Sequence, residues 1–198
     1  MFSKYEVYST VQSMYCYNDT NVLKNKFGIK DFNTLKCIEE EIVSAKMYEL
    51  MKNPVLGRFS RTHFFKIHKF LFGDIYSFAG KVRKEQIWKG DTMFYPPSSI
   101  DNELHKIFNV ISDCKKRKLD KNELIDKTAY IMTELNIVHP FREGNGRSIR
   151  EFIRQWLWSY GYNLNWGNVD KNIILEASIN SVDDYRALVT VLNKCIEQ

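Results

Sequence analysis

One twelve-residue segment, HPFREGNGRSIR at positions 139–150, concentrates the side chains that could perform chemistry. Gly144 and Gly146 let backbone amides approach a ligand closely, and they stand where a helix is predicted to begin. The first N–H groups of a helix have no intrahelical partner, so they favour an anion. Arg147 and Arg150 are three residues apart, which lets both guanidinium groups face that anion. The segment therefore predicts a site for a polyanion such as a chain of phosphates.

Three neighbouring side chains have types that suit chemistry at phosphorus. Asn145 adds an amide to the glycine loop, and Glu143 adds a carboxylate. Mg²⁺ bound to a nucleotide commonly uses one or two carboxylates together with phosphate oxygens. His139 lies four residues before Glu143, and an imidazole whose pKa is near neutrality can take a proton from a hydroxyl nucleophile. Together with the anion site, these residues favour transfer of a phosphorus centre.

Each feature of the segment also has a structural interpretation. His139 could be a buried, hydrogen-bonded residue, and Glu143 could complement a helix N-terminus, an effect of roughly 0.3–1 kcal/mol. Arg147 and Arg150 could form a solvated face. Phe141 is expected to anchor the loop in the core under either interpretation. The segment is neither a Walker motif, GxxxxGK[ST], nor a zinc-binding HExxH.

The segment resembles the signature of the Fic family, HPFx[D/E]GNGRxxR, and matches every specified position. Upstream, LFGDIYSFAGKVR resembles the family's approach to its flap, and IWKGDTMFYPPSSI resembles the flap hairpin itself. This likeness extends over most of the chain. It implies an all-α fold, a Fic-type helical bundle with one β-hairpin flap beside the active-site loop. We expect a Fic domain at residues 31–198, with an N-terminal extension at residues 1–30 that packs on it.

The resemblance also implies an activity, the transfer of AMP from ATP to a Tyr, Ser or Thr hydroxyl of a protein, with release of pyrophosphate. His139 would be the general base, and Glu143 would hold Mg²⁺ against the phosphates. The anion cradle implied by the family comprises Gly144, Asn145 near the α-phosphate, Gly146, Arg147 on the β-phosphate and Arg150 on the γ-phosphate.

Gly146 bears on which group is transferred. Relatives of the Doc type, which transfer phosphate, resemble this motif but carry Lys at the position of Gly146. A bulky cation there would change how a nucleotide lies, so Gly146 favours nucleotidyl transfer. Another nucleotide donor and phosphorylation stay open as alternatives.

The predicted hairpin could position a protein target, because an exposed strand edge can pair with an extended segment of another protein. Residues 84–88 would supply the edge, and the residues assigned to this role are Lys84, Ile87, Trp88 and Met93, with Ile87 and Met93 clamping a target side chain. A structural hairpin that covers the core is the alternative, with Trp88 buried.

Many Fic proteins carry an inhibitory helix with the pattern [S/T]xxxE[G/N], whose Glu pairs with the second motif arginine, here Arg150. In this chain Ser99 and Glu103 have the first spacing, but Leu104 follows, and we treat the match as chance. We therefore expect a toxin-like enzyme that is silenced by a separate antitoxin protein supplying the Glu. The resemblance further suggests subunits of type II topoisomerases as protein substrates.

The elements that must position the motif are predominantly helical. Apolar residues at three- to five-residue steps predict a helix from Asn33, with Leu35, Ile38, Ile42, Ala45 and Leu50 on its face. Ser60 and Asp120 are predicted to cap further helices, and Gly73 to end one. Helices are also expected from Ser98 or Ser99 to about 116, from about 144 to 161, and near 170–180 and 183–195. The turn signal Lys89-Gly90-Asp91 predicts the hairpin.

Composition limits the remaining possibilities for the 198 residues, which carry a net charge of +5. The sequence has no apolar run long enough to span a membrane and no signal-peptide pattern, so we expect a cytoplasmic protein. The four cysteines are far apart, which favours reduced thiols over a disulfide framework or a zinc site. A nucleic-acid-binding module using the basic run CKKRKLDK at 114–121 is the alternative from another class, although we expect no nucleic-acid partner.

Overall fold

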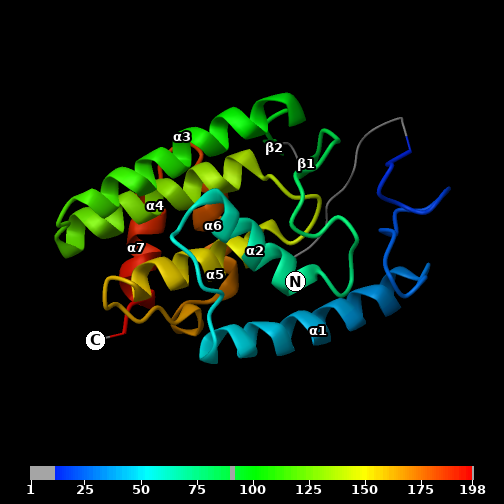
Figure 1. The fold of residues 1–198 in the computed structure, drawn as a ribbon, viewed down its shortest axis with the longest axis horizontal. Coiled ribbons are helices and arrows are strands. Elements are labelled where there is room, and N and C mark those ends of the chain that lie inside the picture. Colours follow the sequence, from blue (N-terminus) through cyan, green and yellow to red (C-terminus); the bar gives the residue numbers. More distant parts are fainter. Residues whose placement is uncertain (1–11, 90–91, 198) are drawn as a thin grey trace.

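The computed structural model describes residues 12–89 and 92–197, and helices dominate it (Figure 1). The elements in chain order are α1 (Phe32–Lys52), α2 (Arg61–Phe72), β1 (Trp88–Lys89), β2 (Thr92–Met93), α3 (Pro97–Lys116), α4 (Lys121–Val138), α5 (Asn145–Trp158), the 3-10 helix η1 (Trp166–Asn168), α6 (Lys171–Asn180) and α7 (Arg186–Cys195). The strands β1 and β2 form an antiparallel hairpin. The expected helical bundle with one hairpin is therefore confirmed for the described part of the chain.

Helix termini follow the capping residues that the sequence offers. The Ser60 side chain accepts a hydrogen bond from the His63 N–H at the start of α2, and Asp120 does so from Glu123 at the start of α4. Both caps were predicted, as was the end of α2 at Gly73. Helix α3 begins at Pro97, slightly earlier than expected, because proline suits the first helical position.

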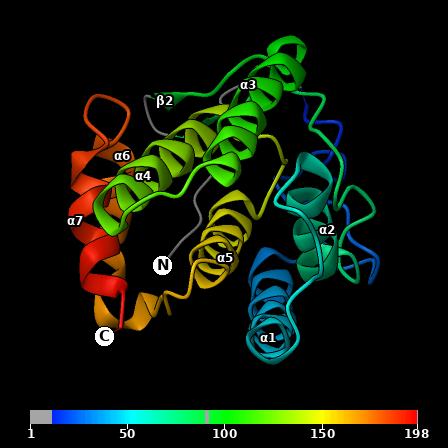
Figure 2. The same cartoon turned by 60° about the vertical axis from the view of Figure 1, so that its left-hand side comes forward.

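Helix α5 lies in the middle of the bundle, between α4 and α2 (Figure 2). Helix α3 runs beside α4, α7 packs on α4 and α6, and α1 packs on α2. Phe141 from the motif segment is fully buried, with its ring centroid 5.2 Å from that of Phe64 on α2. The expected anchoring of the loop by Phe141 is confirmed.

The buried face of α1 differs in part from the prediction. Leu35 and Leu50 are buried as expected, but Ala45 is exposed. Glu39 and Val43 occupy the buried face in its place. The reason is that a stripe at four-residue steps, beginning at Leu35, includes the acidic residue and excludes Ala45.

The described part of the N-terminal extension packs on the core through aromatic and apolar side chains. The Tyr15 ring meets the Phe78 ring edge-on at 5.2 Å, and Val22 is buried. Cys16 and Leu23 form an isolated antiparallel bridge. Residues 1–11 of the predicted extension lie outside the described residues, as do Gly90 and Asp91 of the predicted turn. The boundary at residue 30 stays a prediction.

Two surface features bear on alternative functions. In the described ranges, every helix is too short or too polar to cross a lipid bilayer. The basic run at 114–121 forms the end of α3, the loop that follows and the first residue of α4. Its Arg117 pairs with Glu123 at 2.6 Å, and Lys116 pairs with Asp113 at 2.8 Å. Acidic neighbours thus compensate part of the charge that a nucleic acid would need.

Candidate active site

Two left-handed residues bracket the motif loop. Helix α4 ends at Val138, and His139 follows with φ 46° and ψ 61°. Because Pro140 disfavours the right-handed helical conformation at His139, the chain turns away from the helix axis there. Gly144 has φ 79°, and α5 begins directly after it. The loop therefore joins the C-terminal end of α4 to the N-terminal end of α5.

His139 has a defined tautomer and a defined ring plane. Its Nδ1 lies 3.0 Å from the carbonyl oxygen of Asn136, which can only accept a hydrogen bond. Nδ1 therefore carries the proton, and Nε2 carries the lone pair. The ring stacks on Phe94, with centroids 3.8 Å apart and planes 17° apart. Burial lowers the pKa of His139 to about 3, so the imidazole is neutral at physiological pH.

Arg83 braces the end of α4 that carries His139. Its buried guanidinium donates from Nε to the His139 carbonyl at 2.8 Å and from Nη2 to the Val138 carbonyl at 3.3 Å. It also donates to the carbonyls of Glu85 and Tyr95, on either side of the hairpin. The last carbonyls of a helix lack intrahelical donors, so the cation acts as a C-terminal cap. Arg83 thereby ties the hairpin to the position of His139.

Charged side chains surround the N-terminal end of α5. Glu143 Oε1 accepts from the Gly144 N–H at 2.9 Å and from Arg147 Nη2 at 3.3 Å. Arg147 Nη2 also donates to Glu39 of α1 at 2.7 Å, and its guanidinium lies 4.7 Å from the centroid of the Phe72 ring. Burial, with the neighbouring Glu39 carboxylate second, raises the pKa of Glu143 to about 7.

Glycine is needed at positions 144 and 146 of the loop for two different structural reasons. A Cβ at Gly144 would lie 2.3 Å from the ring of Phe72, so the positive φ and the close approach both require glycine. A Cβ at Gly146 would lie 3.3 Å from Nη1 of Arg150, so glycine leaves room for that guanidinium. Bare backbone at both positions gives a ligand access to the first turn of α5.

The side chain of Asn145 bonds to the backbone of the motif loop. Its Oδ1 accepts from the Phe141 N–H at 2.9 Å, and its Nδ2 donates to the Phe141 carbonyl at 2.7 Å. The residue is fully buried, so these two bonds close the loop onto itself. Its amide side chain is therefore used for loop structure, and only its backbone N–H could belong to a cradle.

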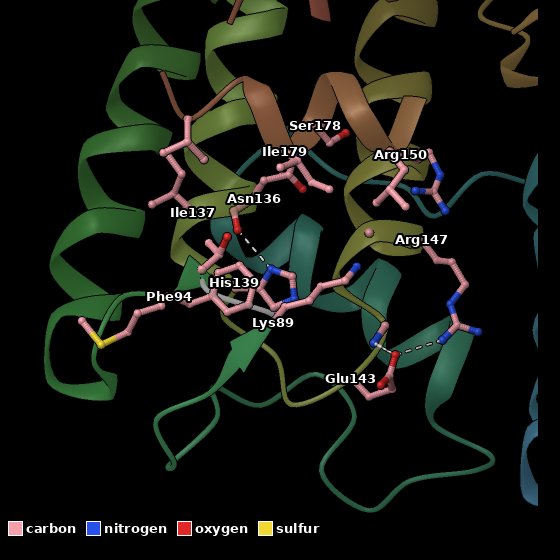
Figure 3. Close-up of a pocket in the computed structure, with 16 residues that line it drawn as sticks. Lys89, Phe94, Asn136, Ile137, His139, Glu143, Arg147, Arg150, Ser178 and Ile179 are labelled. Carbon is pink, nitrogen blue, oxygen red and sulfur yellow. Dashed lines mark hydrogen bonds and ion pairs between the residues drawn. The ribbon is translucent and has the colours of Figure 1, made fainter. Parts of the chain in front are cut away.

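A cavity of about 430 Å³ lies between the two helix ends (Figure 3). His139 and Glu143 line it, together with Gly144, Gly146, Arg147 and Arg150. The structure thus brings the predicted base, carboxylate, glycines and arginines to one cavity, while leaving Asn145 outside its lining. The functional roles of these residues stay predictions.

Sequence reasoning missed two parts of this cavity. Lys89 of β1 lines it beside His139, and burial lowers the pKa of its ammonium (Figure 3). The sequence suggested only a turn there. An apolar wall comes from α6 and its end, and comprises Leu175, Ile179 and Val182, with Ser178 beside them. Tyr185 and Arg186, at the start of α7, are not part of the lining. The sequence carried no signal for this wall, because the exposure of the apolar side chains of Ile179 and Val182 is seen only in the structure.

The hairpin residues assigned to target binding differ in accessibility. Lys84 is exposed, Trp88 is half-buried and Met93 is 62% exposed, so these side chains can meet another protein. Ile87 is only 1% exposed, so the expectation that it clamps a target side chain is wrong. In the described strands, Trp88 faces Met93 across the hairpin and Lys89 faces Thr92.

His68 is a further residue that fixes the motif loop. Its Nδ1 accepts from the Gly80 N–H at 2.8 Å, so Nε2 carries the proton and donates to the Glu143 carbonyl, also at 2.8 Å. Its ring stacks on Phe141, with centroids 3.7 Å apart. His68 lies on α2 and contacts the loop directly. The other two helical histidines do not line the cavity, and their rings bond elsewhere, His63 to the Val55 carbonyl and His105 to Asn109.

Comparison with known proteins finds a matching family model and several similar proteins. The model of the Fic/DOC family matches residues 58–157. The protein adenylyltransferase VbhT of Bartonella schoenbuchensis is 39% identical over 164 residues, which are 82% of this chain and 34% of VbhT. The probable protein adenylyltransferase y4lH of Sinorhizobium fredii is 30% identical over 176 residues, covering 88% of this chain and 90% of the relative.

The two relatives differ in length relative to this chain, which spans about a third of VbhT but nine-tenths of y4lH. Among solved structures, BepC of Bartonella tribocorum with bound AMPPNP superposes with a TM-score of 0.82 at 23% identity. That match covers 92% of this chain and 96% of the BepC chain. The likeness confirms the fold of the described bundle and its hairpin.

Proposed function

The chain belongs to the Fic/DOC family, and from this premise we propose that it transfers AMP from ATP to a hydroxyl group of a protein. The observation that carries the proposal is the position of His139. Its neutral ring, with the lone pair on Nε2, lines the same cavity as the bare backbone and arginines at the start of α5. A base and a polyanion site in one cavity are what nucleotidyl transfer needs.

The donor we propose is ATP, with its phosphates at the start of α5. The cations Lys89, Arg147 and Arg150 line that part of the cavity. The apolar wall of α6, with Ile179 and Val182, would accommodate a base. AMPPNP bound to BepC, a protein of the same fold, supports an adenine nucleotide.

The residues present fit Mg²⁺ that is held mainly by the nucleotide. Within the described ranges no group of three or more His, Cys, Asp or Glu side chains could hold a metal alone. Among the described residues that line the cavity, Glu143 is the one carboxylate, and Mg²⁺ beside phosphates commonly uses one or two carboxylates plus water. Glu143 would therefore hold the ion, which would supply charge stabilisation to the phosphates.

The proposed chemical step uses groups on both sides of the cavity. The hydroxyl oxygen attacks the α-phosphorus, and its proton goes to Nε2 of His139. The bond from the α-phosphorus to the bridging oxygen breaks, and pyrophosphate leaves. Arg147 and Arg150 stabilise the charge that develops on the leaving group. The Asn136 carbonyl bond to Nδ1 keeps the imidazole in the tautomer that can accept the proton.

We propose that the target lies against the hairpin, where Lys84, Trp88 and Met93 are accessible. An extended target segment could pair with the hairpin edge and bring its hydroxyl toward His139. Which hydroxyl is modified, the topoisomerase substrate and the separate antitoxin stay predictions from the family resemblance.

The experiment compares two labels on ATP. The protein is incubated with Mg²⁺, a bacterial lysate and ATP labelled on either the α- or the γ-phosphate, and labelled proteins are identified by mass spectrometry. The proposal requires label from the α-phosphate alone on a protein hydroxyl. Label from the γ-phosphate that appears only when the protein is added to the lysate would instead indicate phosphorylation and would overturn the proposal.

A pair of variants assigns the base. His139→Ala should lower the rate of transfer by about 10²–10⁴ while ATP binding remains, because it removes a positioned base. His105→Ala is the matched control, since His105 is exposed on α3 and its Nε2 lies 3.1 Å from Nδ2 of Asn109, away from the cavity lining. Transfer at the wild-type rate by His139→Ala would exclude this mechanism.

A further inference from the structure

A buried carboxylate of α1 contacts the first arginine of the motif. Glu39 is 9% exposed, and its Oε1 accepts a hydrogen bond from Arg147 Nη2 at 2.7 Å. Glu39 is not among the residues that line the cavity, whereas Arg147 is. It also lies outside residues 58–157, the part of the chain that matches the family model.

We propose that Glu39 is a positioning residue that orients Arg147 toward the phosphates of the nucleotide. This inference rests on the proposed function, because it assigns a role toward the β-phosphate that Arg147 is proposed to bind. It adds α1 to the elements on which nucleotide recognition depends.

Glu39 is itself held in place from a second side. The Tyr76 hydroxyl donates a hydrogen bond to Glu39 Oε2, the oxygen that does not face Arg147. Tyr76 is buried, and its ring stacks on Phe78 with centroids 4.7 Å apart. Both oxygens of the carboxylate are thereby fixed, so Glu39 offers Arg147 one position rather than a range of them.

The geometry around Arg147 explains why a second carboxylate matters. Arg147 Nη2 lies between Glu39 at 2.7 Å and Glu143 at 3.3 Å, above the face of Phe72. A guanidinium has five N–H donors in a fixed fork, so a contact through Nη2 is compatible with a phosphate contact elsewhere on the group. Without Glu39, Glu143 is the remaining carboxylate among the described residues that Arg147 contacts, and Arg147 would turn toward it.

That rearrangement would affect the phosphates of the nucleotide selectively. Arg147 would leave the β-phosphate, and it would also occupy the carboxylate proposed to hold Mg²⁺. AMP has no β-phosphate, so its affinity should not depend on Glu39. A purely electrostatic role predicts the opposite sign, because removal of a negative charge beside the phosphates would tighten the binding of ADP.

The test measures the affinities of ADP and AMP by calorimetry in the presence of Mg²⁺, with Glu39→Gln compared with the wild type. We expect ADP to bind about tenfold more weakly, the scale of one charge-assisted hydrogen bond, with AMP unchanged. Tyr76→Phe keeps the ring but removes the hydroxyl, and it should also weaken the binding of ADP, by a smaller factor. Glu40→Gln is the matched control, since Glu40 is exposed on the same helix and pairs with Lys36.

Arg147→Ala separates the two proposals. The deciding quantity is the ratio of the ADP affinity to the AMP affinity. If Arg147→Ala lowers this ratio while Glu39→Gln and Tyr76→Phe leave it unchanged, the role of Glu39 is overturned and the proposed function stands. If Arg147→Ala itself leaves the ratio unchanged, the assignment of Arg147 under the proposed function is wrong. Tighter ADP binding by Glu39→Gln would also overturn the positioning role. If Glu39→Gln does not fold, the ratio in Tyr76→Phe decides.

Discussion

The cavity is bounded by two helix ends of opposite polarity, and the chain treats them differently. At the C-terminal end of α4, the guanidinium of Arg83 binds the carbonyls of Val138 and His139. At the N-terminal end of α5, no side chain within the described residues caps the helix, and the residue at the cap position is Gly144. One end is closed by the protein itself, and the other has the polarity and bare backbone that suit an anion.

The two helix ends also differ in how their functional side chains are held in place. The His139 ring is held by uncharged groups, among them the Asn136 carbonyl and the stacked ring of Phe94. The arginine side is fixed by ion pairs, and Arg147 could exchange part of these for phosphate without leaving a buried charge unpaired. We therefore expect the α4 end to be rigid and the α5 end to respond to ligand.

The largest effect should come from opening the α4 end with Arg83→Lys. Lysine keeps the charge but lacks the planar fork, so it cannot reach all four carbonyls that Arg83 contacts. Each buried carbonyl left without its donor costs about 1–3 kcal/mol. We expect the free energy of unfolding, measured in urea, to fall by roughly 4 kcal/mol if two carbonyls lose their donor.

A matched substitution shows whether this effect is specific to the brace. Lys84→Arg is the reverse substitution, lysine to arginine, at the neighbouring exposed position, and it should leave the free energy of unfolding unchanged. An Arg83→Lys protein whose stability stays within about 1 kcal/mol of the wild type, the lower bound for one lost donor, would mean that the α4 end is fixed by packing alone. The comparison of the two ends would then fail.

The next largest effect tests whether the α5 end also depends on apolar packing. Gly144→Ala introduces a Cβ 2.3 Å from Phe72 at a φ of 79°. The left-handed conformation costs about 1–2 kcal/mol for a non-glycine residue, and overpacking adds about 1–3 kcal/mol. Urea unfolding should therefore show a loss of about 3 kcal/mol.

Gly161→Ala is the control for the backbone contribution. Gly161 has a φ of 88°, and among the described residues no atom lies within 4 Å of the place that a methyl group would take there. The substitution should cost only the conformational part, about 1–2 kcal/mol. Equal losses for the two variants would show that Phe72 moves aside, so that the α5 end is softer than its packing indicates.

The sequence predicted most of the fold because local signals and tertiary structure agree here. Ser60 and Asp120 cap their helices as expected, and the period of apolar residues placed the helices to within a few residues. The motif residues share a cavity for the same reason, since twelve consecutive residues around one turn cannot lie far apart. The buried side of α1 was mispredicted because a charged residue, Glu39, occupies an apolar stripe.

The parts of the site that were missed come from distant segments. Arg83 and Glu39 are single charged residues in charged surroundings, and their partners lie 55 and 108 positions away along the chain. Asn145 was assigned to the anion because its amide can bind either a ligand or backbone, and residue type does not distinguish these. Burial and partner identity therefore had to come from the structure.

A smaller effect concerns the pH dependence of stability. The pKa of His139 is lowered from 6.5 to about 3 in the folded protein, chiefly by burial. Between these values the unfolded chain takes up a proton and the folded chain does not, so stability falls as the pH is lowered through this window. His139→Asn should make the dependence less steep by up to about 1.4 kcal/mol per pH unit below pH 6.5.

The measurement is urea unfolding of both proteins across the pH range from about 8 to about 4. Above roughly pH 7.5 the two curves should run parallel, because His139 is then neutral in folded and unfolded protein alike. Parallel curves over the whole range would show that the imidazole gains a proton in the folded protein near its usual pKa. The inference that the end of α4 is rigid and shields His139 from water would then be wrong.

The smallest effect isolates the stacked ring that covers His139. Phe94→Leu keeps an apolar side chain of similar volume, so stability should fall by only about 1 kcal/mol. It leaves part of the imidazole face open to water, and because burial is the main cause of the low pKa, the pKa of His139 should rise. NMR titration of the imidazole checks this, with Met93→Leu as the control at the neighbouring, exposed position. An unchanged pKa in Phe94→Leu would show that the backbone, rather than the hairpin, shields the His139 imidazole from water. Movement of the hairpin would then leave the pKa of His139 unchanged.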